Sequence, residues 1–293
     1  MIHSKPCNRK LARNTKALSP AVSTIILTGT MVALISVSVV FVNGFLWARV
    51  AESDFNSAKQ FMQTMGLQID DVAWAVGRKG TVRYASTYGS VNFLPSALNY
   101  TVYIKTQSNG TYQSLGSYRV GVLLFNMPVY HYSAFDGYYE PIYPASPKDL
   151  TFTGTSAPVA RVFGVERLTP SMGDGSFTRV VVAPSVRWLF SNMTTTNSST
   201  SYTRLYLPVL TESGSRGSSQ SVTFTGASVT ANTKNQITSI KITVAFPAAA
   251  QGFDNAFFHF PSLTQIIDVP AGYVDSVIEL YTGVVNVELG VHS

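Results

Sequence analysis

The side chains that could do acid–base or metal chemistry are few and far apart. In the body of the chain, histidines occur only at His131, His259 and His292, with no metal-binding spacing. Asp70 and Asp71 are neighbours, so on a helix they point in different directions and cannot share a proton. The chain has no His-Glu-x-x-His motif, no Gly-x-Ser-x-Gly motif and no phosphate-binding glycine loop. We therefore expect no catalytic residues, no metal and no enzymatic activity, and we rank a surface hydrolase as a distant alternative.

A second kind of chemistry that the sequence offers is attachment of glycans to asparagine. Four Asn-x-Ser/Thr sequons occur, at Asn99, Asn109, Asn192 and Asn197. Their number proves little in a chain rich in Ser and Thr. Asn192 and Asn197 lie in the polar stretch 191–203, which predicts an exposed loop, so we favour these two. Apart from N-linked glycans, we expect no cofactor.

An aromatic-rich stretch, YHYSAFDGYYEPIYP, covers residues 130–144. Exposed aromatic rings can stack on sugars or hold a surface. An alternative interpretation is a long loop at a sheet edge whose rings pack onto the protein itself. The candidate adhesive residues are Tyr130, Tyr132, Tyr138, Tyr139 and Tyr143.

The distribution of charge argues against nucleic-acid binding. Charged residues make up 12% of the chain, against about 25% in an average soluble domain. The net charge is +6, but residues 1–17 hold five basic residues and no acid. The remaining 16 basic residues face 15 acidic ones, so the body lacks the basic surface that phosphate contacts require. The single cysteine, Cys7, lies in this basic leader, so the body can form no disulfide.

A long apolar run follows the basic leader. Residues 17–48 contain no charged side chain, and a helix of about 20 apolar residues spans a bilayer core. The run is too long for a secretory signal, whose apolar region has about 7–15 residues. Because the basic residues precede the run, we expect the N-terminus to lie in the cytoplasm and the body outside.

The run also contains the signals of a helix that continues beyond it. Ser19 is a good N-cap, and Pro20 suits the first helical position. After Trp47, apolar residues continue at steps of three and four to about Val76, and Gly77 then ends the pattern. We therefore predict one helix over residues 18–76, whose second half packs one apolar face on the body. The expected buried positions are Ala51, Phe55, Ala58, Met62, Met65, Ile69, Val72 and Ala73.

The leader and the start of the run resemble the archaeal type IV pilin-like family, with its class III signal peptide. The resemblance rests on the short basic leader and on the motif LSPAVSTIIL at residues 18–27. Val22 stands where bacterial pilins usually carry Glu, which favours the archaeal branch. The resemblance implies that a prepilin peptidase cleaves between Ala17 and Leu18, after Lys16, and removes residues 1–17.

The resemblance also implies a function and a set of partners. The freed helix would leave the cytoplasmic membrane and enter the core of an extracellular, adhesive filament. Its partners would be other copies of the chain in a helical homopolymer, the prepilin peptidase, the pilus assembly ATPase and its membrane platform. Small residues such as Gly29 and Ala33 would let helices pack closely. The expected filament-core residues are Ile25, Ile26, Gly29, Ala33, Ile35, Val39, Phe41 and Trp47.

Two other functions are compatible with an apolar helix followed by an extracellular body. One is a permanently anchored surface protein that binds sugars or other solutes and keeps its leader. The other is an archaellin, a subunit of the rotary filament, whose leader usually leads into a Gly-rich start rather than Ser-Pro. The N-terminus of the mature protein distinguishes the anchored protein from a filament subunit.

The body, residues 78–293, predicts an antiparallel β-sandwich of Ig-like class. Short runs rich in Val, Ile, Thr, Tyr and Phe alternate with Gly, Pro and Ser turns. No long helical period follows residue 77. Polar stretches at 191–203 and 211–221 could divide the body into two β units, but we prefer one elaborated domain because the strands on both sides are alike. The fold class expected is α+β.

Overall fold

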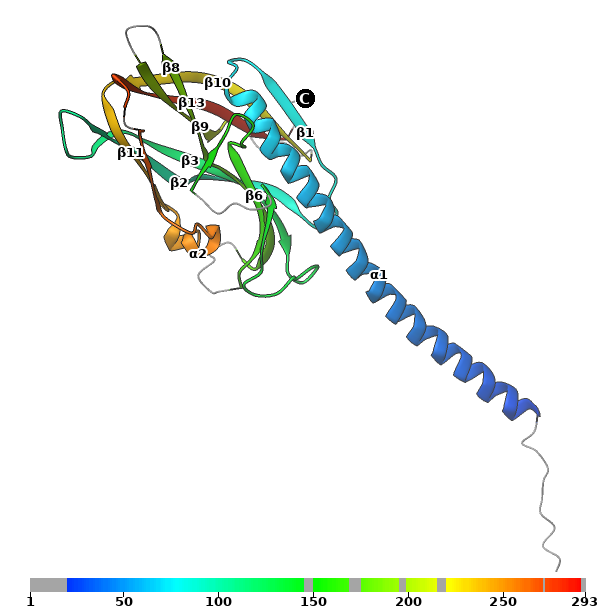
Figure 1. The fold of residues 1–293 in the computed structure, drawn as a ribbon. Coiled ribbons are helices and arrows are strands. Elements are labelled where there is room, and N and C mark those ends of the chain that lie inside the picture. The colour runs from blue at the N-terminus through cyan, green and yellow to red at the C-terminus, as the bar shows by residue number, and fades with distance from the viewer. Residues whose placement is uncertain are drawn as a thin grey trace, which may run out of the picture. The chain divides into compact units, whose positions relative to one another are not determined.

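The computed structural model describes residues 20–144, 150–168, 175–194, 199–214, 220–270 and 272–290 (Figure 1). The chain divides into two compact units, with the boundary between Arg49 and Val50. The first unit contains the apolar half of a long helix. The second contains the rest of that helix and a mostly β domain, which we call the head.

Helix α1 spans Pro20–Ala73 without interruption. Pro20 is its first residue, and the helix ends three residues earlier than the sequence pattern suggested. Gly77 turns the chain with a φ of +80°, a conformation that glycine adopts without a steric penalty. The predicted N-cap Ser19 and the cleavage residues Lys16, Ala17 and Leu18 lie outside the described residues.

The first sheet of the head has six strands and contains two parallel pairs. The expected all-antiparallel arrangement is therefore wrong for this sheet. β9 and β13 are separated by three other strands and more than 60 residues, which is long enough for the crossover that a parallel pair requires. The order is β1 (Lys79–Arg83), β10 (Ser221–Lys234), β13 (Asp275–Leu289), β9 (Ser199–Glu212), β8 (Val186–Thr194) and β5 (Thr151–Thr153).

The second sheet has seven strands, and all of its pairs are antiparallel. A 3-10 turn at Ala249–Gln251 and a short helix α2 at Asn255–Phe258 follow β11. The order is β12 (Thr264–Asp268), β11 (Ile237–Ala245), β2 (Ser90–Thr106), β3 (Gln113–Pro128), β7 (Phe177–Pro184), β6 (Ala160–Glu166) and β4 (Tyr139–Tyr143).

The strands differ from the sequence pattern in two places. The two runs expected near residues 273 and 283 form one long strand, β13, because the glycine between them stays in the ladder. The polar stretch 191–203 is largely a hairpin, in which β8 pairs with β9 up to Thr194 and Ser199. Both sheets take strands from each side of residues 191–221.

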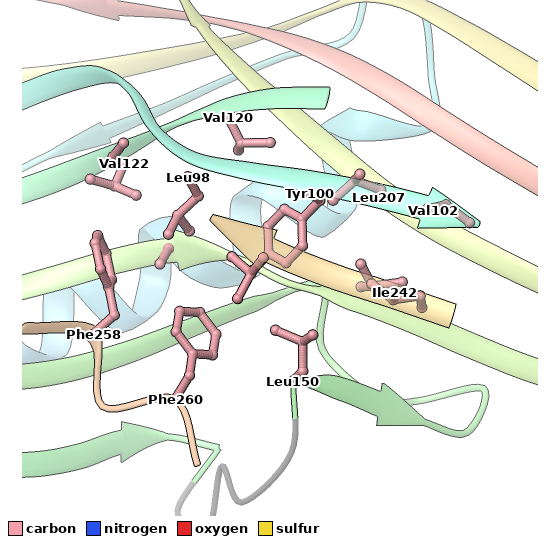
Figure 2. Packing of buried hydrophobic residues seen from close by; sticks show 14 of the residues in the cluster. Leu98, Tyr100, Val102, Val120, Val122, Leu150, Leu207, Ile242, Phe258 and Phe260 are labelled. Carbon is pink, nitrogen blue, oxygen red and sulfur yellow. The ribbon is translucent and has the colours of Figure 1, made fainter. Parts of the chain in front are cut away.

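One hydrophobic core lies between the two sheets. Leu98, Tyr100 and Val102 of β2 contribute from the second sheet, and Leu207 of β9 from the first (Figure 2). Phe258 of α2 closes this core at one side. The alternation of buried and half-buried residues along β2 and β9 shows how period-two patterning places one side chain in two in the core.

A second core lies on the opposite faces of the same strands, and α1 covers it. In β3, Val122 belongs to the first core while the neighbouring Leu123 belongs to the second. The predicted helix positions from Ala51 to Ala73 are all buried, at 1% exposure or less, so the expected packing of this helix face is confirmed. Burial of each large side chain in this stripe contributes about 1.5–3 kcal/mol. The second half of α1 is therefore an integral part of the head.

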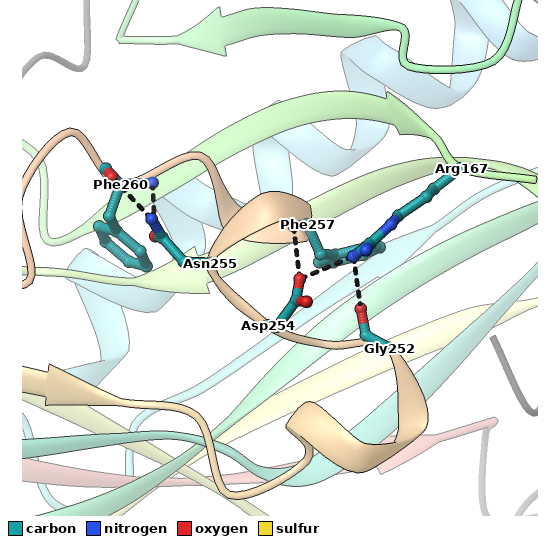
Figure 3. Close-up of polar contacts among 6 residues, drawn as sticks. All are labelled: Arg167, Gly252, Asp254, Asn255, Phe257 and Phe260. Atoms are coloured by element: carbon teal, nitrogen blue, oxygen red, sulfur yellow. Dashed lines mark hydrogen bonds and ion pairs between the residues drawn. The ribbon is translucent and has the colours of Figure 1, made fainter. Parts of the chain in front are cut away.

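The segment around α2 is fixed by polar contacts. Asp254 caps the helix by accepting a hydrogen bond from the backbone N–H of Phe257, and it forms a 2.6 Å ion pair with Arg167 (Figure 3). Arg167 also donates to the carbonyl of Gly252 at 3.2 Å. Burial opposes ionisation of Asp254, but the hydrogen bond and charge of Arg167 hold the pKa of this carboxyl below its ordinary value. These contacts keep the α2 phenylalanines in the first core.

Candidate functional site: the exposed half of the long helix

The first half of α1 presents apolar side chains on all sides. From Val22 to Val50 every residue is exposed, and no residue of the apolar window long enough to cross a membrane is buried. This is the reverse of a soluble helix, which buries its apolar stripe. The residues predicted to lie in a filament core are all exposed in the single chain: Ile25, Ile26, Gly29, Ala33, Ile35, Val39, Phe41 and Trp47.

Three hydroxyl groups of this half are satisfied within the helix. Thr28 donates to the carbonyl of Thr24 at 2.8 Å, and Ser36 donates to that of Val32 at 2.8 Å. Thr30 makes the same kind of bond to Leu27 at 2.9 Å. In hydrocarbon an unpaired polar group costs several kcal/mol, so these internal bonds allow small polar residues in an apolar environment.

Small side chains leave shallow hollows along this surface. A Cβ added at Gly29 or Gly44 would meet nothing within 4 Å. Open grooves run between larger neighbours, one of them lined by Leu34, Val42 and Leu46. Such grooves between side-chain ridges are the surfaces into which the ridges of another helix fit.

The helix enters the head at Asp54, which the sequence analysis did not single out. Its Oδ2 accepts three hydrogen bonds from the β1–β2 connection: from Ser86 Oγ at 2.8 Å and from the backbone N–H groups of Thr87 and Tyr88 at 3.0 and 3.1 Å. Hydrogen bonds to a charged acceptor are stronger than neutral ones. Asp54 therefore ties the first turn of the buried half of α1 to the head.

Two glycines hold the other end of the helix. A Cβ built at Gly283 of β13 would lie 2.2 Å from the carbonyl oxygen of Ala73, and one at Gly226 of β10 would lie 2.3 Å from that of Ala75. Gly226 also exchanges backbone hydrogen bonds with Gly77 and Arg78, at 2.7 and 2.9 Å. The end of α1 thus lies directly on the sheet backbone, where only glycine leaves room.

The last turn of α1 makes a polar contact with the first sheet as well. Asp70 accepts from Arg187 at 3.1 Å and from the indole N–H of Trp74 at 2.9 Å. The Arg187 guanidinium lies 4.9 Å from the centre of the Tyr206 ring. Asp71 instead pairs with Arg78 at 2.7 Å, so the two adjacent carboxylates have separate partners, as expected.

The five candidate adhesive tyrosines differ in solvent exposure. Tyr130 is 80% exposed, whereas the other four are half-buried. Tyr132 stacks on Phe55 of α1 with ring centres 4.9 Å apart, and Tyr139 lies 4.2 Å from the ring of His259. Tyr138 donates its hydroxyl to Glu140, and Tyr143 packs on the second core. Most of these rings therefore serve to attach residues 130–143 to the head.

Carboxylates under this segment hold it in place. Glu166 is fully buried and accepts from Ser133 Oγ at 2.5 Å and from the N–H of Ala134 at 2.6 Å. Glu140 pairs with Lys59 of α1 at 2.5 Å. Burial opposes ionisation of Glu140, but its hydrogen bonds from Lys59 and Tyr138 hold its pKa below the ordinary value, while burial and Glu140 raise the pKa of Tyr138.

The described sequon asparagines occupy different environments. Asn99 is half-buried in the middle of β2, between β3 and β11, and its Oδ1 accepts from Ser117 at 3.0 Å. Asn192 is exposed on β8, and its Nδ2 donates to the hydroxyl of Tyr273 at 3.1 Å.

Asn109 lies at the tip of the β2–β3 hairpin. Its Oδ1 accepts hydrogen bonds from the N–H and the hydroxyl of Thr111 at 3.1 and 2.8 Å. Asn197 lies outside the described residues.

Within the described residues, no group of three or more His, Cys, Asp or Glu side chains is placed to hold a metal ion. His131 lies against the rings of Tyr88 and Tyr130, with ring centres 4.3 Å apart in each case. His259 packs on Tyr139, and burial lowers its pKa. His292 lies outside the described residues. Both described histidines therefore have packing partners among the aromatic rings.

The fold thus defines a β-rich domain carrying a long N-terminal helix, half of which is apolar, exposed and able to anchor the protein in a membrane. Comparison with models of known protein families, with curated proteins and with solved structures finds no match to this chain.

The residues that sequence reasoning missed are those that join the helix to the head. Gly226 and Gly283 carried a usable signal, because an isolated glycine inside a strand pattern often marks a bulge or a close backbone approach. A β-bulge does occur between Gly226 and Ser228. Asp54 carried no such signal, since one acidic residue on an amphipathic helix ordinarily faces solvent.

Proposed function

We propose that this chain is the structural subunit of an extracellular, adhesive filament of the type IV pilus kind. It polymerises through the first half of α1 after a prepilin peptidase has removed residues 1–17. The observation that carries the proposal is the uncovered apolar half of α1 beside a head that already has two complete cores. An anchor needs only about 20 such residues, whereas this exposed apolar surface runs from Val22 to Val50.

The proposed mechanism follows from what surrounds the apolar half of α1 before and after cleavage. In the precursor, with its N-terminus inside the cell, the bilayer surrounds the apolar half of α1. After cleavage, neighbouring copies of the same helix replace lipid around it, and their contacts are head-to-tail and do not close into a ring, so that they form a filament. The assembly ATPase and its membrane platform would supply the work of extraction. The internally bonded hydroxyls and small residues suit both environments.

The proposal includes an Ig-like β-sandwich as the class of the head. A core enclosed by two sheets supports a sandwich. The parallel β9–β13 pair and the seven-stranded second sheet would then be elaborations of that plan. A solved structure of a relative with the simpler strand order would test this part of the proposal.

The experiment that tests the filament is the N-terminal sequence and intact mass of protein sheared from the cell surface. We expect a chain that begins at Leu18, recovered in filaments. A chain that begins at Met1 and stays with the membrane would contradict the proposal and would instead establish a permanently anchored surface protein. A control fraction of unsheared membranes shows whether the precursor is present.

We also propose glycosylation at Asn109, in preference to Asn192 and Asn197, the two sites that the sequence favoured. The Nδ2 of Asn109 makes no hydrogen bond to the described residues, and its neighbours Ser108 and Gly110 at the hairpin tip are exposed. The Nδ2 of Asn192, which is itself exposed, is bonded to Tyr273. We therefore expect Asn109→Gln to lower the intact mass by one glycan. Asn99→Gln is the matched control and should change the mass only by the substitution itself. Loss of a glycan from the Asn99 variant instead would contradict this assignment.

A further inference from the structure

Strand β10 has a free edge over its second half. On one side, β13 pairs with β10 from Val222 to Lys234. On the other side, β1 pairs with it only from Ser221 to Thr225, and no other strand of the described residues lies there. Residues 227–236 are all exposed or half-buried. Residues 228–234, which we call the β10 edge, therefore border the first sheet without a neighbouring strand.

The register with β13 shows which backbone groups of the β10 edge point outward. Alternate residues of an antiparallel strand bond to a given neighbour, and Gly290, directly after β13, donates its N–H to the carbonyl of Ser221 at 2.8 Å. The even-numbered residues of β13 therefore face β10, and beyond the bulge their partners are Ser228, Thr230 and Asn232. The residues between these direct their N–H and C=O groups away from the sheet, where they make no hydrogen bond to the described residues: Val229, Ala231 and Thr233.

The other edges of the two sheets carry features that discourage pairing with a further strand. β1 contains Lys79 and Arg83, β4 contains Pro141, and β5 and β12 have only three and five residues. Charge, proline and short length are common protections of a free edge. The β10 edge contains no proline, and its one charged residue, Lys234, stands at its end. Its backbone groups are therefore open to a further strand.

We propose that the β10 edge pairs with the same edge of a second copy of the chain, antiparallel and centred on Ala231. This inference rests on the proposed function, because we place the two copies in neighbouring filaments. Each outward-pointing residue has one donor and one acceptor, so an identical edge in the reverse direction offers a partner for every group. In this register Ala231 faces Ala231 of the second copy, and Val229 faces Thr233.

The side chains favour self-pairing over binding of an unrelated peptide. Lys234 faces Ser228 in the proposed register, so the two lysines lie at opposite ends of the pair and no like charges face each other. Thr230 faces Asn232, and both side chains can form hydrogen bonds. A foreign peptide bound at a sheet edge takes its specificity from side-chain pockets. A strand of small Ser, Thr, Ala and Asn residues is poorly suited to form them.

The consequence of this pairing is side-by-side association of filaments. The pair is two-fold symmetric and closed, so it joins two chains and cannot extend a filament by itself. It is therefore separate from the helical contacts proposed for α1. One short strand pair is a small interface, and we expect two isolated chains to associate weakly. Two filaments that each present many copies of the edge bind through many pairs at once, which raises the overall affinity.

The first test is a disulfide at the centre of the pair. Cys7 is the only cysteine, so the full chain is made with Cys7→Ser and Ala231→Cys. Facing residues of a hydrogen-bonded antiparallel pair have Cα atoms about 5.5 Å apart, which a disulfide can span. We expect mild oxidation of sheared filaments to convert most of this variant to a covalent dimer that reduction reverses. Val274→Cys, at a site 73% exposed on the head, is the matched control and should stay monomeric. Equal dimer formation at both sites, or none at either, would overturn the inference.

The second test separates self-pairing from binding of another strand. Ala231→Lys and Ala231→Glu each place like charges opposite one another in the proposed pair, which is unfavourable. Filaments of either variant alone should lose side-by-side association in electron micrographs, and a mixture of the two should regain it. Loss in both variants without recovery in the mixture would assign the edge to a different partner and refute self-pairing. Unchanged association in both variants, or unsubstituted filaments that stay apart, would refute any role of the edge.

These outcomes are distinct from a failure of the proposed function. Ala231 lies in the head, in a strand far from α1 in sequence, so all of these variants should still begin at Leu18 and form filaments. If the unsubstituted chain yields no filaments, the proposed function fails. The disulfide test is then made on the concentrated full chain in detergent. A dimer at residue 231 but not at residue 274 would support the pairing, and monomers at both would overturn it.

Discussion

Replacement of Ile35 by Asp is expected to abolish filaments. Ile35 lies in the middle of the apolar half of α1 and is 60% exposed in the single chain. A carboxylate at this depth costs about 2.5–3.5 kcal/mol on membrane insertion alone. In a filament core the same charge would be buried without a partner, which is a larger penalty. The measurement is the amount of subunit recovered in the sheared fraction, with electron microscopy of that fraction.

Two controls separate loss of assembly from general damage. Ile35→Val keeps an apolar side chain at the same position and should form normal filaments. Val274→Asp places the same charge at a site of similar exposure on the head and should also assemble. Normal filaments from the Ile35→Asp variant would show that this half of α1 is not buried in a filament core, and the proposed function would have to be abandoned.

The second large effect is expected from Gly283→Ala, which should destabilise the head by about 3 kcal/mol, at the upper end of overpacking effects. The added Cβ would lie 2.2 Å from the carbonyl oxygen of Ala73 and 3.0 Å from its carbonyl carbon. Because these are backbone atoms, no side-chain rotation relieves the clash, and the end of α1 must move off β13. Gly226→Ala should behave similarly, since its Cβ would meet the carbonyl oxygens of Ala75 and Val72 at 2.3 and 2.7 Å.

The measurement is urea unfolding of the full chain in detergent, followed by tryptophan fluorescence. Trp74 lies at the affected contact, with its ring centre 5.2 Å from that of Tyr206. Gly110→Ala is the matched control, because a Cβ there meets nothing within 4 Å and the residue has an ordinary φ. A Gly283→Ala variant as stable as the Gly110→Ala variant would mean that the helix end is not seated on the sheet as described.

The helix could be predicted from sequence because its determinants are local. The charge-free run, Pro20 at the helix start and the apolar steps from Ala51 to Ala73 each depend on residues within one or two turns. Period and composition sufficed to predict an apolar first half long enough to cross a membrane and a second half that packs on the head. Most long strands were predictable for the same reason, since alternation along β2 or β9 is visible in the chain itself.

What only the tertiary structure decided depends on residues far apart in sequence. The parallel pairing of β9 with β13 follows from how the chain crosses the domain, which no local pattern records. The candidate adhesive tyrosines looked alike in sequence, yet Tyr132 is held by Phe55 while Tyr130 is left exposed. The sequence by itself determined an apolar helix and a β-rich head, because hydrophobic period is a local property. Only the tertiary structure shows that the end of this helix packs on Gly226 and Gly283, because that contact brings together backbone atoms of α1, β10 and β13, which are far apart in sequence.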